Sequence, residues 1–216
     1  MNSFPQILET LACLLEYPDH RLAGRLRENL SPALKHFTTA ISVLAPPQRE
    51  ELYTATFDVT PACVLNVSIH LFGEENFKRG EFMAGLQARY SQTGFSTMGE
   101  LPDHLSVLLR FAAQTDETER RELVEFCLLG PVTGMIAAFN ESNPYRTLLE
   151  AVRDTLRHAY PGMQPPPSPL EQMRSHGAGC ATASPACACV PMRINDGPDD
   201  EAATGIIQPD PQLFTT

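Results

Sequence analysis

The sequence lacks the signatures of several enzyme classes. It contains neither a Gly-rich phosphate loop of the Walker type nor a dinucleotide-binding fingerprint. A nucleophile elbow and the paired histidines of a zinc protease are also absent. A di-iron helical bundle needs Glu-x-x-His pairs, but Glu16 with His20 and Glu100 with His104 are each one residue too far apart. These absences argue against nucleotide chemistry, serine-type hydrolysis and di-iron chemistry.

Basic residues are scarce, and long hydrophobic runs are missing. The 216 residues include 16 Lys and Arg against 26 Asp and Glu, which gives a formal net charge of −10. Nucleic acid and anionic lipid are recognised by clustered basic residues, so neither is expected as the main partner. No apolar run is long enough to cross a bilayer, and no basic region precedes the first apolar residues. We therefore expect a cytoplasmic protein that does not insert into the membrane.

Cysteine and histidine form one metal-like cluster, near the C-terminal end. His176, Cys180, Cys187 and Cys189 could in principle close a zinc site, but their spacing matches no paired Cys-x-x-Cys knuckle. A loose segment with reactive thiols is the alternative, and Cys187 with Cys189 could also form a redox pair. The remaining cysteines stand singly on apolar faces and are expected to be free thiols: Cys13, Cys63 and Cys127.

Apolar residues recur at helical spacing through most of residues 1–160, between punctuating prolines and glycines. This pattern predicts an all-α fold, a compact single-domain helical bundle over residues 1–160. Residues 161–216 differ sharply, since they hold 10 of the 19 prolines and one aromatic residue. Such a segment buries too little apolar surface to order itself, so we expect a disordered C-terminal tail.

Residues 100–114 read as the helix around which the chain is organised. Pro102 suits the first helical position, and Glu100 and Asp103 are acidic where the helix dipole favours negative charge. The sequence therefore predicts a helix that starts at Pro102 and has a buried body. The two acidic residues are either capping residues alone or part of a binding site. The predicted apolar face consists of Leu101, Leu105, Leu108, Leu109 and Ala112.

Two other residues stand out within predicted helices. His70, on an apolar helix, is interpreted as a core histidine whose polar atoms are satisfied. Gly80 lies inside the long helix predicted over residues 74–93, where glycine costs about 1 kcal/mol relative to alanine. Such a glycine allows close approach of another helix or of a bound peptide, and packing of the chain's own helices is the interpretation that we favour.

Several segments, taken in order, resemble the nitrate reductase delta subunit family, the NarJ-type molybdenum cofactor assembly chaperones within the TorD/DmsD-like redox enzyme maturation group. The most distinctive is the Glu-Leu-Pro-Asp-His-Leu run of residues 100–105, followed by Leu109 and Phe111. The resemblance covers about residues 4 to 160. The other matching segments are residues 53–58, 70–73, 78–80, Leu86, Tyr90, Gly94, 143–145 and 148–149.

The resemblance implies a fold of stacked helices and a chaperone, not an enzyme. Such a chaperone binds the N-terminal segment of the apo catalytic subunit of nitrate reductase. It keeps that subunit competent for molybdenum cofactor insertion and membrane-complex assembly, and it binds no cofactor stably itself. Contacts with cofactor delivery proteins and a monomeric or weakly dimeric state are compatible with this role. The alternatives are a related client, such as a chlorate-, selenate- or dimethyl-sulfoxide-type reductase, a subunit that stays in the reductase, or a metal or redox protein using the tail cysteines.

The motif suggests where a client would bind. We expect Glu100, Asp103 and His104 to line one end of an apolar groove, whose acidic rim would attract a basic leader segment. Because the charge of histidine changes near neutrality, His104 would make binding pH-sensitive. The full set of candidate client-binding residues is Glu100, Pro102, Asp103, His104, Leu105, Phe57, His70, Phe72, Arg79 and Tyr90.

Overall fold

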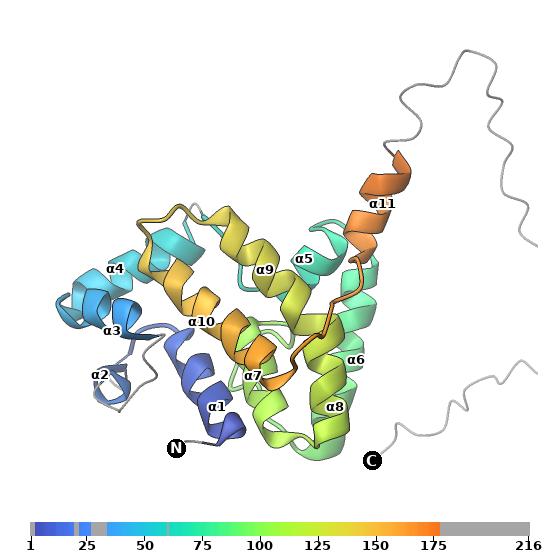
Figure 1. Ribbon diagram of the computed structural model, residues 1–216, viewed down its shortest axis with the longest axis horizontal. Helices are drawn as coiled ribbons and strands as arrows, with labels where there is room; N and C mark the ends of the chain where they lie inside the picture. The colour runs from blue at the N-terminus through green and yellow to red at the C-terminus, as the bar shows by residue number, and fades with distance from the viewer. Residues whose placement is uncertain (1–2, 20–21, 27–33, 60, 178–216) are drawn as a thin grey trace, which may run out of the picture. The chain divides into compact units, whose positions relative to one another are not determined.

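The fold is known from a computed structural model, which describes residues 3–19, 22–26, 34–59 and 61–177 (Figure 1). The prediction of an all-α fold is confirmed, because no β-strand occurs in these ranges and the chain forms one isolated antiparallel bridge, between Asn66 and His104. The helices are α1 (Phe4–Leu14), α2 (Leu22–Arg25), α3 (Lys35–Ser42), α4 (Pro46–Phe57), α5 (Val67–Phe72), α6 (Lys78–Thr93), α7 (Leu105–Gln114), α8 (Glu117–Glu122), the π-helix η2 (Leu123–Leu128), α9 (Leu129–Ala138), α10 (Pro144–Ala159) and α11 (Pro169–Gly177).

Helix α7 lies at the centre of the core. All eight residues from Leu105 to Ala112 are buried, and α7 packs mainly against α1. Helix α1 begins with a capping box, in which the Ser3 hydroxyl accepts from the backbone N–H of Gln6 and the Gln6 side chain accepts from the backbone N–H of Ser3. The expectation that the body of this central helix is buried is therefore confirmed.

The start of α7 differs from the prediction. The helix begins at Leu105, with His104 as its N-cap, rather than at Pro102. The reason is a pairing with a distant segment, because Leu105 N–H donates to the carbonyl of Leu65 (2.9 Å) and Val67 N–H donates to the carbonyl of Asp103 (2.9 Å). These bonds hold residues 100–104 in a non-helical conformation. Because Val67 N–H takes part in this pairing, helix α5 begins only at Val67.

Helix α6 is shorter than predicted, and its structure contradicts the interpretation given above for Gly80. It begins at Lys78 and ends at Gly94, whose positive φ of 70° gives the left-handed helix terminus that glycine favours. Gly80 is exposed, and apart from its neighbours and the backbone of its own helix no atom lies within 4 Å of the position that its Cβ would occupy. Close approach of another helix therefore does not explain this glycine.

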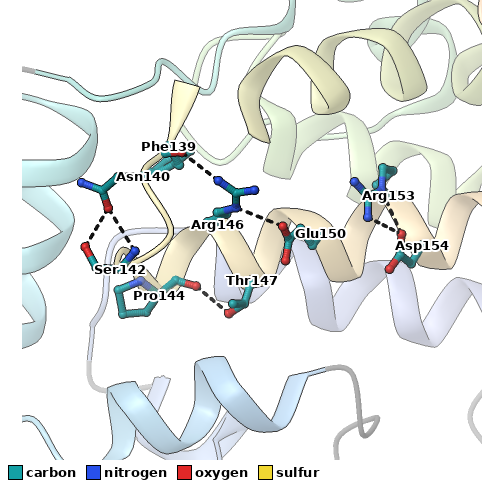
Figure 2. Close-up of polar contacts among 9 residues, drawn as sticks. All are labelled: Phe139, Asn140, Ser142, Pro144, Arg146, Thr147, Glu150, Arg153 and Asp154. Carbon is teal, nitrogen blue, oxygen red and sulfur yellow. Dashed lines mark hydrogen bonds and ion pairs between the residues drawn. The ribbon is translucent and has the colours of Figure 1, made fainter. Parts of the chain in front are cut away.

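The second half of the chain forms a helical layer from α8 to α10. The π-helix η2 precedes Pro131, as expected for a break at this site, since proline cannot donate to the carbonyl one turn before it. Helix α10 starts as predicted, with the Asn143 side chain accepting from Tyr145 N–H and Pro144 at the first position. Figure 2 shows Arg146 joining the Phe139 carbonyl to the Glu150 carboxylate, which ties the turn between α9 and α10 to the helix.

Part of the segment predicted as a tail lies within the described residues. An extended stretch follows α10 and leads to α11, which packs against α5 (Figure 1). Cys180, Cys187 and Cys189 lie outside the described residues, and the side chain of His176 is not described either, so the metal and redox hypotheses remain predictions. No helix in the described part of the chain is long and apolar enough to span a membrane.

Candidate functional site

A cavity of about 270 Å³ opens beside the segment 100–104, where it meets the end of α1 and the end of α4. Three of the predicted binding residues, Phe57, Glu100 and His104, line it. Tyr17 and Leu101 stand at its margin with about half of their surface exposed, 50% and 54%. Leu101 was predicted on the buried face of a helix, and its exposure follows from the later start of α7. The remaining lining residues are Tyr53, Asp58, Val64, Leu65 and Asn66.

A second hollow, of about 450 Å³, shares Tyr17 with this cavity and runs along α4. Its lining includes Glu50, Glu51 and the exposed Val59. We call the two hollows together the Tyr17 groove. Its carboxylates are Glu50, Glu51, Asp58 and Glu100, and none of its described lining residues is Lys or Arg. The groove therefore combines exposed apolar side chains with an acidic rim.

The floor of the Tyr17 groove is a packed aromatic cluster. The Tyr53 ring packs against those of Tyr17 (5.5 Å between centroids) and Phe57 (4.9 Å), and Phe57 packs against Tyr145 of α10 (4.9 Å). The Tyr53 hydroxyl donates to the carbonyl of Leu15 (3.2 Å), and burial raises the pKa of this phenol, so it stays neutral. Because the rings come from the segment after α1, from α4 and from α10, the floor is a surface built by tertiary packing.

His104 presents a defined tautomer to the groove. Its Nδ1 accepts from the backbone N–H of Ser106 (3.3 Å) and lies 2.8 Å from the Ser106 hydroxyl. Since this nitrogen is an acceptor in the helix cap, the proton of the neutral ring resides on Nε2. Burial lowers the pKa of His104, although the carboxylates of Glu100 and Asp103 act in the opposite direction. The ring is therefore a neutral hydrogen-bond donor at neutral pH.

This arrangement predicts a loss of stability in acid. Because the pKa of His104 is lower in the folded protein than in the unfolded chain, the unfolded chain takes up the proton first as the pH falls below about 6.5. The free energy of unfolding should therefore decrease between pH 7.5 and pH 5.5. His104→Asn keeps a good N-cap and removes the titration, so urea unfolding of this variant should show a smaller decrease.

The exposed His158 provides the control for this experiment. His158→Asn should show the same decrease as the wild type, and a decrease in His104→Asn as large as in wild type would contradict the prediction. His70 accounts for the decrease in the free energy of unfolding that remains in His104→Asn, because burial lowers the pKa of His70 as well.

Asp103 lies behind the groove and does not line it. Its side chain is fully buried, with Oδ1 accepting from Asn66 Nδ2 (3.0 Å) and Oδ2 accepting from the backbone N–H of Ser68 (3.4 Å) and from the Ser68 hydroxyl. Arg79 joins the same network, since its Nε donates to the Ser68 hydroxyl (3.0 Å) and its guanidinium also donates to the carbonyl of Glu74 (2.7 Å). Asp103 and Arg79, two predicted site residues, are thus brought together through Ser68.

Two more predicted residues, Tyr90 and Leu105, hold the segment 100–104, and Tyr90 does so through a third, Pro102. The Tyr90 hydroxyl donates to the carbonyl of Pro102 (2.8 Å), and the Tyr90 ring packs against Phe111 (4.7 Å between centroids). Both Tyr90 and Leu105 are fully buried. These residues therefore position the segment and leave Glu100, Leu101 and His104 to face the groove.

His70 and Phe72 lie apart from the Tyr17 groove. Phe72 packs against Phe82 of α6 (5.6 Å between centroids). His70 Nε2 is 2.9 Å from the carbonyl of Val64, which fits the interpretation of a satisfied histidine, and its ring lines a different cavity beside α9. The structure thus divides the predicted set into groove-lining residues, supporting residues and these two.

Sequence reasoning missed several groove residues. Tyr17 and Asp58 line the Tyr17 groove but were not among the candidate client-binding residues, and Ser68 was not singled out at all. An aromatic residue directly before Pro18 was the signal available for Tyr17, and the matching segment 53–58 was the signal available for Asp58. Ser68 gave no local signal, because its role depends on Asp103.

The thiols of the core behave as predicted for structural cysteines. Burial raises the pKa of Cys63 to about 12 and that of Cys127 to about 11, so both are protonated thiols at neutral pH. Neither is in a disulfide. These two cysteines therefore serve as small apolar side chains of the core.

The chain thus forms a helical domain that carries an acidic, aromatic groove with a buried polar network behind it. The fold is shared with a putative redox enzyme maturation protein from Archaeoglobus fulgidus, whose crystal structure superimposes with a TM-score of 0.54 at 18% identity and covers 73% of this chain and 96% of that one. The model of the nitrate reductase delta subunit family matches residues 23–156. The chain belongs to this family.

Two curated relatives carry names that state their role. A probable nitrate reductase molybdenum cofactor assembly chaperone NarJ from Bacillus subtilis is 31% identical over 127 residues, which span 53% of this chain and 68% of that protein. The nitrate reductase molybdenum cofactor assembly chaperone NarJ of Escherichia coli K12 is 31% identical over 139 residues, or 58% of each chain. The match thus spans between about half and two thirds of these proteins.

Proposed function

We propose that this chain is a chaperone that binds the N-terminal segment of the apo catalytic subunit of respiratory nitrate reductase in the Tyr17 groove. It holds the subunit competent for molybdenum cofactor insertion and for assembly with the membrane subunits, acts in the cytoplasm and carries out no bond-making of its own. The observation that supports this most directly is the Tyr17 groove itself. Its pairing of exposed apolar side chains with four carboxylates suits a basic amphipathic peptide, and family membership supplies the class of client.

The groove suggests how such a segment would bind. An amphipathic helix lays its apolar face into an apolar groove, and here Tyr17, Val59 and Leu101 are the exposed contacts available. Basic residues on the flanks of the peptide would meet Asp58 and Glu100. Exposed charges of this kind speed encounter and select the partner more than they add affinity.

The remaining candidate residues act through the segment that carries Glu100 and His104. Asp103, Arg79 and Tyr90 are positioning residues, because their polar atoms bond to this segment or to its neighbour and do not face the groove. Cofactor insertion is a property of the client in this proposal, and the chaperone needs no cofactor of its own.

The experiment is a titration of the full chain with a labelled peptide of the catalytic subunit's first 15 to 20 residues. The double charge reversal Asp58→Lys with Glu100→Lys should lower affinity by about tenfold or more, on the basis of roughly 1 kcal/mol for each rim charge. Binding to the wild type should also weaken as salt is raised. The matched control is Glu75→Lys, an exposed residue outside the groove lining, which should leave affinity unchanged within about twofold.

Either of two outcomes would overturn the proposal. If the wild-type protein binds no nitrate reductase leader, the proposed client is wrong. If the double variant binds as tightly as the control, the Tyr17 groove is not the binding site. Leaders of chlorate-, selenate- and dimethyl-sulfoxide-type reductases serve as competitors, and tighter binding of one of these would reassign the client.

A further inference from the structure

A second groove lies on another part of the molecule, between α5, α9 and the chain that follows α10. It encloses about 600 Å³, and its walls include His70 and Leu71 of α5, Phe126 of η2 and Gly134 of α9. Phe126 has 53% of its surface exposed, which is unusual for a phenylalanine. The fourth wall is the chain itself, in residues 164–174.

The groove is shaped to the residues that cover it. Leu170 Cδ1 lies 3.4 Å from the position that a Cβ on Gly73 would occupy, and Pro165 Cβ lies 3.7 Å from the corresponding position on Gly130. A methyl group at either glycine would be in ordinary van der Waals contact with the covering segment, so the segment packs directly over both positions. Gly73 also has a φ of 88°, so the turn after α5 needs glycine for its backbone.

The covering segment has its own local structure and only shallow attachment. Residues 165–167 are three consecutive prolines, which favour an extended conformation, and Ser168 then caps α11 through a reciprocal pair of bonds with Glu171. Residues 171–175 are exposed, including Met173 at 50%. The segment therefore rests on the groove mainly through Pro165 and Leu170.

We propose that the groove between α5 and α9 is a second peptide-binding site, and that residues 164–174 are its internal, displaceable cover. The site takes an extended proline-containing segment followed by an apolar residue at the start of a short helix, the chemistry that the chain itself presents. This goes beyond the client site at the Tyr17 groove, from which its described lining residues are entirely distinct.

Residues 164–174 can keep the site closed because they are covalently joined to α10. A segment tethered at α10 is present at an effective concentration of order millimolar, so a free peptide at micromolar concentration competes poorly with it. Once the segment is released, an unfolded polypeptide partner with the same pattern gains access to His70 and to the buried Leu71. The site is therefore closed at rest and opened by whatever draws residues 164–174 away.

The test uses the full chain and a labelled synthetic peptide of residues 163–177. Leu170→Asp places a charge in the contact with Gly73 and should release the segment, so this variant should bind the peptide at least tenfold more tightly than the wild type. Met173→Asp is the matched control, because Met173 lies on the same helix with half of its surface already exposed. It should bind as weakly as the wild type.

A third variant shows where the peptide binds. Gly134 is exposed on α9 and lines the groove, so Gly134→Leu fills the site while improving helix propensity. The double variant that carries both Leu170→Asp and Gly134→Leu should not show the gain in peptide binding expected for Leu170→Asp alone. Trypsin should also cleave after Arg174 at least fivefold faster in Leu170→Asp than in Met173→Asp, which reports release without any ligand.

Equal peptide binding in the wild type, Leu170→Asp and Met173→Asp would overturn the proposal, as would binding that survives Gly134→Leu. Circular dichroism of each variant checks that its helices are intact. The cleavage rate then reports release separately from binding.

Discussion

Replacing Asp103 with alanine is expected to lower the free energy of unfolding by about 3 kcal/mol, because it leaves several buried donors without an acceptor. The donors are Asn66 Nδ2, the backbone N–H of Ser68 and the Ser68 hydroxyl, and the Arg79 guanidinium bonds to that hydroxyl in turn. The whole network lies between α5, α6 and the segment 100–104. Its loss should therefore loosen this segment as well as destabilise the fold.

Urea unfolding followed by circular dichroism measures this effect. Asp103→Asn, which keeps one carbonyl acceptor and the side-chain volume, should lose less stability than Asp103→Ala. The control is Glu100→Ala, an exposed neighbour whose removal should change stability by about 0.5 kcal/mol or less. Equal midpoints for Asp103→Ala and Glu100→Ala would show that the network does not stabilise the protein.

Asp103→Ala also tests whether Asp103 positions the segment 100–104 or contacts the client directly. Since Asp103 is fully buried, it cannot touch a client bound in the groove as the structure stands. Any loss of peptide affinity in Asp103→Ala should therefore be smaller for Asp103→Asn and should accompany faster hydrogen exchange in residues 100–104. A contact residue such as Glu100 should instead change affinity without changing exchange.

Removing Arg110 is expected to have a destabilising effect of similar size. The Arg110 guanidinium pairs with the Glu16 carboxylate at 2.7 Å, and this pair joins α7 to the segment that follows α1, with only 8% and 20% of the two side chains exposed. Arg110→Met leaves the carboxylate largely buried without its partner. We expect a loss of about 3 kcal/mol, the lower end of the range for breaking buried pairs.

A double variant tests this explanation. Arg110→Met with Glu16→Met removes both charges and should recover much of the lost stability, because the cost arises from the unpaired carboxylate and not from the absent pair. Arg153→Met is the control, since Asp154, its partner, is 58% exposed and such pairs contribute little. A loss in Arg110→Met no larger than in Arg153→Met would contradict the prediction.

Local signals predicted those elements whose causes are local. Helix α10 starts at Asn143 and Pro144 as expected, because a side-chain cap and a first-turn proline act on neighbouring backbone atoms. The apolar periodicity of α7 likewise indicated a buried helix, and all residues from Leu105 to Ala112 are buried. The end of α6 at Gly94 follows the same rule.

Errors arose where a distant segment supplies the partner. Pro102 has every local feature of a helix start, yet the carbonyl of Leu65 binds Leu105 N–H and the helix begins at Leu105. Asp103 was predicted to line the groove, but its carboxylate bonds to Asn66 and Ser68 behind the groove, and the local sequence gives no sign of either contact. Gly80 was assigned a helix contact that the fold does not provide.

The candidate site divides in the same way. The amino-acid sequence alone determined that the chain is helical, acidic and a member of a chaperone family, and that residues 100–105 are its most distinctive segment, since composition, periodicity and motif order are properties of the linear chain. Only the tertiary structure decided that Glu100 and His104 face the groove while Asp103 supports it. The orientation of the segment 100–104 depends on its hydrogen bonds with Leu65, Val67 and Ser68. These residues are distant in the sequence and come near the segment only when the chain folds.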